Sequence, residues 1–363
     1  MLRMKIAVLI ENSETLKRFV QPLSGKFDAG LEIYAFTDKE KAINSLLEDG
    51  INLFLIECDA DIKSEEIPKM CTLVYLSESD TVKEIKGVKT ICLYHRPDTI
   101  YKELMEIFAE STDASINSIG GKSSAANIYT FLSPIGGVGT STIAAAFAVY
   151  LTQYQRKVLY LNFEKNGDSA AFFSGDGACD MSDIFYDIKS KKPNLAIRIE
   201  SKVKLDDSGV FFVESCRNAL DMVYVTGRDI AEFVNTISEL KLFDDIVIDT
   251  DCSMDDRMLE AIRLSNNTIV VNDGKGISNA KILRFFSAMA GFENEKEESF
   301  ISKIYMFMNK FDKERYSFDE RFKNIILGGI DDYYDEVPRQ IIQRAIRSDV
   351  FDYYYYSKER FSM

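Results

Sequence analysis

The residues best suited to chemistry lie in the stretch SPIGGVGTST, which runs from Ser133 to Thr142. An apolar stretch typical of a buried strand precedes it, and an alanine-rich stretch typical of a helix follows it. Glycines allow positive φ and close backbone approach, so a strand, a glycine turn and a helix present N–H groups to a phosphate. The stretch therefore predicts a phosphate-binding loop, although it lacks the usual lysine. The alternative, a tight turn without a ligand, is disfavoured by three glycines followed by Thr-Ser-Thr.

Apolar strands are predicted on both sides of this loop in the second half of the chain. The strand before it covers 127–134, and the later ones cover 243–251, 267–274, 304–312 and 325–330. In order and spacing, these pieces resemble the ParA/MinD class of P-loop ATPases, whose loop reads KGGxGK[ST]T. The resemblance implies an α/β domain over 127–363, with a mostly parallel sheet covered by helices on both faces.

The same resemblance implies ATP and Mg²⁺ as cofactors and assigns the residues that hold them. The nucleotide-binding residues are Gly136, Gly137, Val138, Gly139, Thr140, Ser141, Thr142, Asn162, Glu164, Asn309 and Lys310. Ser141 and Asp249 match the residues that hold the metal, and Asp249 ends the strand that corresponds to the Walker B strand. Asn162 and Glu164 stand at the two acid positions of the switch I stretch, and Asn309 matches the adenine contact.

Both lysines of the family's loop are replaced, the first by Ile135 and the second by Thr140. The second lysine places a charge beside the β- and γ-phosphates, and electrostatic stabilisation dominates phosphoryl transfer. Its loss should harm turnover more than binding, so we expect nucleotide binding with slow or absent hydrolysis and, at most, a weak ATPase. No catalytic residue is assigned. Lys165 or Lys275 could supply the charge from a nearby loop, but exposed lysines are the default interpretation.

The first 109 residues predict a separate α/β domain. Five apolar strands alternate with helical patterns, which indicates a parallel sheet covered on both faces. The strands are expected at 5–10, 31–36, 51–57, 72–77 and 89–94. A stretch rich in Ser, Gly, Ala and Asn, 110–126, is typical of a linker between the two domains.

Polar residues follow the carboxyl ends of these strands, where parallel sheets bind their ligands. Glu11 and Asn12 follow the first strand, Glu57 and Ser77 end the third and fourth, and Arg96 follows the fifth. This layout resembles the receiver domain of response regulators, which has a flavodoxin-like fold. Glu57 stands in place of the phosphorylated aspartate, and Asn12 replaces a metal-binding acid. We therefore predict a receiver-like domain that binds other proteins rather than accepting a phosphate.

A receiver-like domain ahead of a ParA/MinD-like domain is the layout of the TadZ/CpaE pilus-assembly family, and nearly the whole chain resembles it. The resemblance implies a cytoplasmic homodimer that binds ATP and helps to place a Tad-type pilus at a cell pole. It also implies that other pilus-assembly or secretion components bind the receiver-like domain.

Three alternatives remain open. One is a degenerate scaffold that binds no nucleotide, and another is a DNA-partitioning ATPase. The net charge of −14 argues against the second, because a nucleic-acid surface needs clustered Lys and Arg. The third is a MinD-type protein that cycles on membranes, for which four tyrosines, Tyr353 to Tyr356, could lie at the interface. No apolar run approaches the roughly 20 residues of a membrane-spanning helix.

Overall fold

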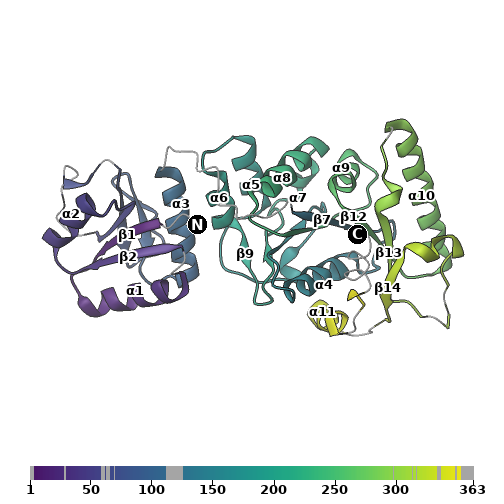
Figure 1. The fold of residues 1–363 in the computed structure, drawn as a ribbon, viewed down its shortest axis with the longest axis horizontal. Coiled ribbons are helices and arrows are strands. Elements are labelled where there is room, and N and C mark those ends of the chain that lie inside the picture. Colours follow the sequence, from purple (N-terminus) through teal and green to yellow (C-terminus); the bar gives the residue numbers. More distant parts are fainter. Residues whose placement is uncertain are drawn as a thin grey trace, which may run out of the picture. The chain divides into compact units, whose positions relative to one another are not determined.

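The computed structural model describes residues 4–27, 30–58, 62, 66–68, 70–111, 126–296, 298–312, 314–315, 317–332, 337–347 and 350–352. The chain forms two compact units, Met1–Ile119 with Ser190–Lys202, and Gly120–Lys189 with Val203–Met363 (Figure 1). Helix α3 extends to Ser111, and the rest of the expected linker up to residue 125 lies outside the described residues, as do Tyr353 to Tyr356.

The described part of the first unit is built on a sheet of six strands in the order β2-β1-β3-β4-β6-β5. Its strands are β1 (Met4–Leu9), β2 (Leu31–Phe36), β3 (Leu53–Glu57), β4 (Thr72–Ser77), β5 (Glu84–Ile85) and β6 (Val88–Cys92). All neighbours are parallel except β5 and β6. The prediction of five parallel strands is confirmed, and the two-residue β5 is an addition that the sequence analysis did not include.

Helices α1 (Ser13–Phe27), α2 (Lys39–Glu48) and α3 (Pro97–Ser111) accompany this sheet. Helix α2 is capped at its start by Asp38, whose side chain accepts a hydrogen bond from the backbone N–H of Lys41 at 3.0 Å. It is followed by Gly50, whose φ of 64° is the left-handed conformation that glycine adopts without strain.

The first unit also contains a helix from much later in the chain, α6 (Leu195–Lys202). The side chain of Ile197 is 1% exposed and belongs to the same apolar cluster as Leu104 and Phe108 of α3. The Asn194 amide, just before α6, donates a hydrogen bond to the carbonyl of Ala109 at 3.0 Å. A segment inside the range 127–363 therefore completes the core of the first unit.

The described part of the second unit has an eight-stranded sheet in the order β14-β13-β12-β7-β11-β8-β10-β9. Its strands are β7 (Asn127–Leu132), β8 (Val158–Asn162), β9 (Lys204–Leu205), β10 (Phe211–Phe212), β11 (Asp245–Asp249), β12 (Asn267–Asn272), β13 (Ile304–Asn309) and β14 (Ile326–Ile330). Only the pair β9–β10 is antiparallel. The carboxyl ends of the central strands therefore meet at one edge, as the predicted mostly parallel sheet requires.

Helices lie between these strands in the chain, and one follows the last strand. They are α4 (Thr140–Thr152), α5 (Met181–Lys189), α7 (Ala219–Val223), α8 (Gly227–Leu240), α9 (Asp256–Leu264), α10 (Gly276–Lys296) and α11 (Pro338–Arg347), with short 3₁₀ turns at Ser169–Ala171, Ile301–Lys303 and Glu320–Ile325. No helix among the described residues is both long and apolar enough to cross a membrane.

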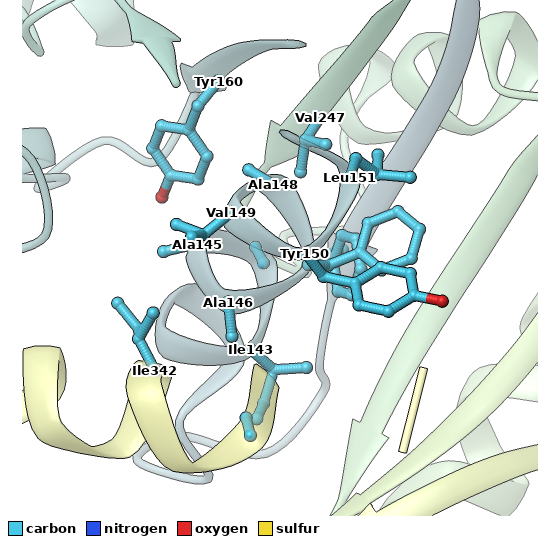
Figure 2. Close-up of a cluster of buried hydrophobic side chains, with 14 of the residues drawn as sticks. Ile143, Ala145, Ala146, Ala148, Val149, Tyr150, Leu151, Tyr160, Val247 and Ile342 are labelled. Atoms are coloured by element: carbon cyan, nitrogen blue, oxygen red, sulfur yellow. The ribbon is translucent and has the colours of Figure 1, made fainter. Parts of the chain in front are cut away.

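Helix α4 is buried along nearly its whole length, and every residue from Ile143 to Leu151 is less than 9% exposed. Figure 2 shows its side chains between Tyr160 and Val247 of the sheet and Ile342 of α11. A helix that is apolar all round must be covered on all sides, and its small alanines allow close approach. The loop that precedes α4 is thereby attached to a helix that is packed on all sides.

We expect Ile197→Ala to destabilise the first unit by about 2–5 kcal/mol, because it removes a buried side chain from the contact between α6 and α3. The same change at Ile277, which is 72% exposed, should stay within about 0.5 kcal/mol. Denaturant unfolding with hydrogen exchange checks this, since Ile197→Ala should speed exchange in α3. Equal effects of the two substitutions would contradict the assignment of α6 to this core.

Candidate functional site

The predicted phosphate loop lies between the carboxyl end of β7 and the first turn of α4. Gly137 and Gly139 have φ values of 76° and 83°, which favour glycine at both positions. Space is open beside Gly136 and Gly137, because a Cβ built at either position would meet no described atom within 4 Å. The loop therefore combines a helix N-terminus with the room that a phosphate would need.

Two residues from the end of β13 contact this loop directly. The Asn309 side chain, which is 3% exposed, donates a hydrogen bond to the carbonyl of Val138 at 2.5 Å. The Lys310 ammonium donates to the carbonyl of Gly137 at 3.2 Å. A Cβ at Gly139 would lie 2.5 Å from the Asn309 amide nitrogen, so only glycine fits there. Asn309 and Lys310 were predicted from their likeness to an adenine contact. In the structure, both side chains bind backbone carbonyls of the loop and so hold it in place.

A buried group of polar side chains lies beside the start of α4. Ser141 Oγ donates to Glu164 Oε2 at 3.3 Å, and the Asn162 amide reaches the same oxygen at 3.5 Å. Asn162 also donates to Asp249 Oδ2 at 3.2 Å, and the Tyr160 hydroxyl donates to that oxygen at 2.9 Å. The structure thus brings together Ser141, Asn162, Glu164 and Asp249, as the sequence analysis predicted.

The other carboxylate oxygen of Asp249 is left without a hydrogen-bond donor among the described residues, although the side chain is fully buried. Buried polar atoms are nearly always satisfied, so an orphaned carboxylate oxygen needs a ligand, a water or a metal ion. Mg²⁺ is commonly held by one or two carboxylates together with phosphate oxygens and waters. Ser141 and Asp249 therefore fit the metal position that was predicted for them.

Burial and the nearby Glu164 carboxylate raise the pKa of Asp249 to about 8, although the hydrogen bond from Tyr160 opposes the rise. The pKa of Glu164 is also raised, chiefly by burial, with a further contribution from Asp251. Two carboxylates that both resist ionisation at short range would be relieved by a cation between them.

In the stretch after β8, Gly167 lies so close to the Asn162 side chain that no other residue would fit. A Cβ on Gly167 would fall 2.0 Å from the Asn162 side-chain oxygen, and that oxygen accepts the backbone N–H of Glu164 at 2.9 Å. Asn162 therefore positions Glu164 in addition to contacting Asp249, which makes it a structural bridge within the site.

The two lysines that could have replaced the missing loop lysine each lie beside an acid. The Lys165 ammonium is 3.4 Å from Asp255 Oδ2, and the Lys275 ammonium is 2.9 Å from Asp273 Oδ2.

Comparison with known proteins finds a likeness for each of the two units. Residues 2–109 match the family model of the TadZ-like receiver domain. A ParA family ATPase from Chlorobium tepidum TLS superposes with a TM-score of 0.50 at 22% identity, covering 63% of this chain and 91% of its own. This chain joins a TadZ-like receiver domain to a domain with the ParA fold.

Two further solved structures superpose with lower scores. A putative plasmid partition protein from Borrelia burgdorferi B31 bound to AMPPNP has a TM-score of 0.44 at 18% identity, over 64% of this chain and all of its own. MinD from Pyrococcus horikoshii OT3 complexed with Mg-ADP has a TM-score of 0.46 at 15% identity, over 63% and 88%. No curated protein matches the chain.

In the TadZ-like receiver domain, the residues at the carboxyl edge of the sheet bind one another. Oε2 of Glu57 accepts the backbone N–H of Glu11 at 3.2 Å. The side-chain oxygen of Asn12 accepts the backbone N–H groups of Glu14 and Thr15, so Asn12 caps α1. His95 lies 3.2 Å from Glu103. Asn12 thus has a structural role at the position of a metal-binding acid.

Sequence reasoning missed Tyr160 and Asp251 at the site in the ParA-fold domain. Tyr160 was given no role, and only the parallel pairing of β8 with β11 brings its hydroxyl beside Asp249. Asp251 follows β11 and accepts the backbone N–H of Lys165 at 3.3 Å. A tyrosine two residues before Asn162 in a buried strand was the available signal for the first of these.

We expect Asp249→Asn to change how stability depends on pH in the absence of nucleotide and Mg²⁺. The folded pKa of Asp249, about 8, lies above the unfolded value of about 3.9, so the fold retains this proton. The resulting stabilisation is complete below about pH 4 and is lost as pH rises to about 8. The free energy of unfolding of the wild type, relative to the variant, should fall by up to about 1.4 kcal/mol per pH unit across that interval. Parallel curves from chemical denaturation between pH 5 and 9 would contradict the raised pKa.

Proposed function

We propose that the ParA-fold domain binds a nucleoside triphosphate with Mg²⁺ and hydrolyses it slowly or not at all. ATP is the nucleotide that the resemblance implies. The observation that carries the proposal is the open glycine loop at the start of α4, beside a buried carboxylate whose second oxygen lacks a donor among the described residues.

The residues divide the task by their chemistry. The backbone N–H groups from Gly136 to Thr142 would hold the phosphates, helped by the hydroxyls of Thr140 and Thr142. Ser141 and Asp249 would hold Mg²⁺, which neutralises negative charge on the phosphate oxygens when it is bound. Glu164 would add a second acid at the edge of this group, positioned by Asn162.

Slow hydrolysis is expected because the loop carries no positive charge of its own and the site has no general base at Asn162. Thr140 carries no charge to stabilise the transition state, and Lys165 and Lys275 pair with acids. Asn162 cannot accept a proton as a carboxylate could, and its amide is used to bind Asp249 and Glu164. The amide contacts that support binding do not depend on any of these charges.

A nucleotide that is bound and seldom cleaved acts by stabilising one state of the protein. We propose that this state is a homodimer that serves as a scaffold or slow switch in Tad-type pilus assembly and its placement at a cell pole. The TadZ-like receiver domain would bind other components of that machinery rather than accept a phosphate. Its Glu57 and Asn12, at the positions of the phosphorylated aspartate and a metal-binding acid, are engaged in internal hydrogen bonds.

Calorimetry tests nucleotide binding. Wild-type protein titrated with ATP and Mg²⁺ should show a dissociation constant in the micromolar range, and Gly136→Asp should bind at least about 10-fold more weakly. Gly136 has a negative φ and open space beside it, so aspartate can fold there while placing a negative charge against the phosphates. Gly291→Asp is the matched control, because it adds the same charge in open space about 22 Å from the first residue of α10. If no nucleoside triphosphate binds up to millimolar concentration, the chain is a nucleotide-free scaffold.

Restoring the loop charge tests the reason for slow turnover. Thr140→Lys should raise phosphate release by about 100- to 1,000-fold, because one well-placed donor is worth that much to a charged transition state. Thr140→Met, which has a long uncharged side chain, should leave the rate unchanged. A wild-type rate equal to that of Thr140→Lys would contradict the missing lysine as the cause of slow hydrolysis.

A further inference from the structure

The hydrogen bonds to Asp249 are divided unevenly between its two carboxylate oxygens. Oδ2 accepts from the Tyr160 hydroxyl at 2.9 Å and from the Asn162 amide at 3.2 Å. Oδ1 is buried and has no hydrogen-bond donor among the described residues. A carboxylate has about four acceptor positions, two on each oxygen, so the two donors fill Oδ2 and leave Oδ1 open.

The fold fixes the Tyr160 hydroxyl in this place. Strand β8 pairs with β11 in parallel, and Asn162 lies beside Asp249 in the register. Side chains two residues apart lie on the same face of a strand, so Tyr160 and Asn162 approach Asp249 from one side of the sheet. The Tyr160 ring is fully buried in the apolar cluster around α4 (Figure 2). It packs edge-on against Phe173, with ring centroids 5.0 Å apart, so the hydroxyl cannot swing to another acceptor without opening this cluster.

The Tyr160 hydroxyl is the simpler of the two donors. A phenol carries one proton and keeps it at neutral pH, and here that proton goes to Oδ2 of Asp249. The Asn162 side chain is shared, because its oxygen accepts the backbone N–H of Glu164 and its amide also reaches Glu164 Oε2. Removing the Tyr160 hydroxyl would therefore free one acceptor position on Oδ2 and leave the contacts that position Glu164 in place.

The number of open oxygens decides how Asp249 can hold a metal ion. A carboxylate that binds a cation through both oxygens needs an open acceptor position on each, and the two donors leave none on Oδ2. Mg²⁺ demands near-ideal octahedral geometry, in which single carboxylate oxygens fit. Ca²⁺ is larger, takes about six to eight oxygen ligands and can bind a carboxylate through both oxygens. An Asp249 that offers one oxygen therefore suits Mg²⁺ better than Ca²⁺.

We propose that Tyr160 restricts Asp249 to one metal-binding oxygen and thereby makes the site favour Mg²⁺ over Ca²⁺. The proposal rests on the proposed function, since it concerns the metal that would accompany the nucleotide. Tyr160 acts through its hydrogen bond to Asp249, so it is a positioning residue that sets metal specificity. Without its hydroxyl, Oδ2 could join Oδ1 in holding the larger ion.

Calorimetry tests the proposal by measuring ATP binding in EDTA, in Mg²⁺ and in Ca²⁺. The gain in affinity that each metal gives over EDTA reports on the metal site, whereas a general loss of structure lowers all three affinities together. In the wild type, the gain from Mg²⁺ should exceed the gain from Ca²⁺. In Tyr160→Phe, the ratio of the Mg²⁺ gain to the Ca²⁺ gain should fall about 10-fold, the effect of one hydrogen bond to a charged group.

Tyr150→Phe is the matched control. It removes the same hydroxyl from another buried tyrosine, which also donates to an aspartate, because the Tyr150 hydroxyl lies 2.8 Å from Asp352 Oδ1. Tyr150 lies about 14 Å along α4 from Ser141, so its hydroxyl is remote from the metal position. This variant should leave the gains from both metals unchanged.

The outcomes separate this inference from the proposed function. If ATP does not bind the wild type in any of the three conditions, nucleotide binding fails and the role of Tyr160 fails with it. If ATP binds but the wild type gains no more from Mg²⁺ than from Ca²⁺, or the ratio survives Tyr160→Phe, the role of Tyr160 is overturned and nucleotide binding stands. If Tyr160→Phe does not fold, Asn162→Ala replaces it, because it frees the other acceptor position of Oδ2. An unchanged ratio in that variant would likewise overturn the proposal.

Discussion

The burial of helix α4 is the constraint on which the rest of the second unit depends. Its first turn follows the glycine loop, and its remaining turns are covered by the sheet and by α11. A helix covered in this way cannot rotate or shift without opening the core. The loop is therefore held at a fixed height above the ends of β7 and β11, and Ser141 is held beside Glu164 and Asp249. The placement comes from alanines and aromatic rings further along the helix, so it does not depend on a lysine at position 135 or 140.

That rigidity explains how a site can keep its form after losing its lysines. The carboxylates of Asp249 and Glu164 lie close together in a buried place, which is unfavourable without a cation. Tyr160 and Asn162 offset part of this by donating hydrogen bonds, and one oxygen of Asp249 remains without a described donor. An arrangement with this electrostatic strain is retained more readily when a metal and a phosphate group use it than when nothing does.

Much of the fold could be predicted, and the reasons are visible in particular residues. Strands β2 and β4 have the expected bounds, because apolar runs and turn residues alternate clearly there. The grouping of Ser141, Asn162, Glu164 and Asp249 was also predicted, though only through resemblance to a family. The hydrogen bond from Tyr160 to Asp249 could not be foreseen, because it depends on which strands pair. The same holds for α6, whose apolar face gives no sign that its partner lies some 90 residues earlier.

The place of α6 has a consequence for biosynthesis. The last helix of the first unit's own sequence, α3, ends at Ser111, whereas the helix that covers part of it ends at Lys202. Ribosomes add about 5–20 residues per second, so roughly 5 to 20 seconds pass between the two events. During that interval the nascent receiver domain carries an uncovered apolar face on α3. Its final packing waits for the glycine loop, α4 and β8 of the other unit to be translated.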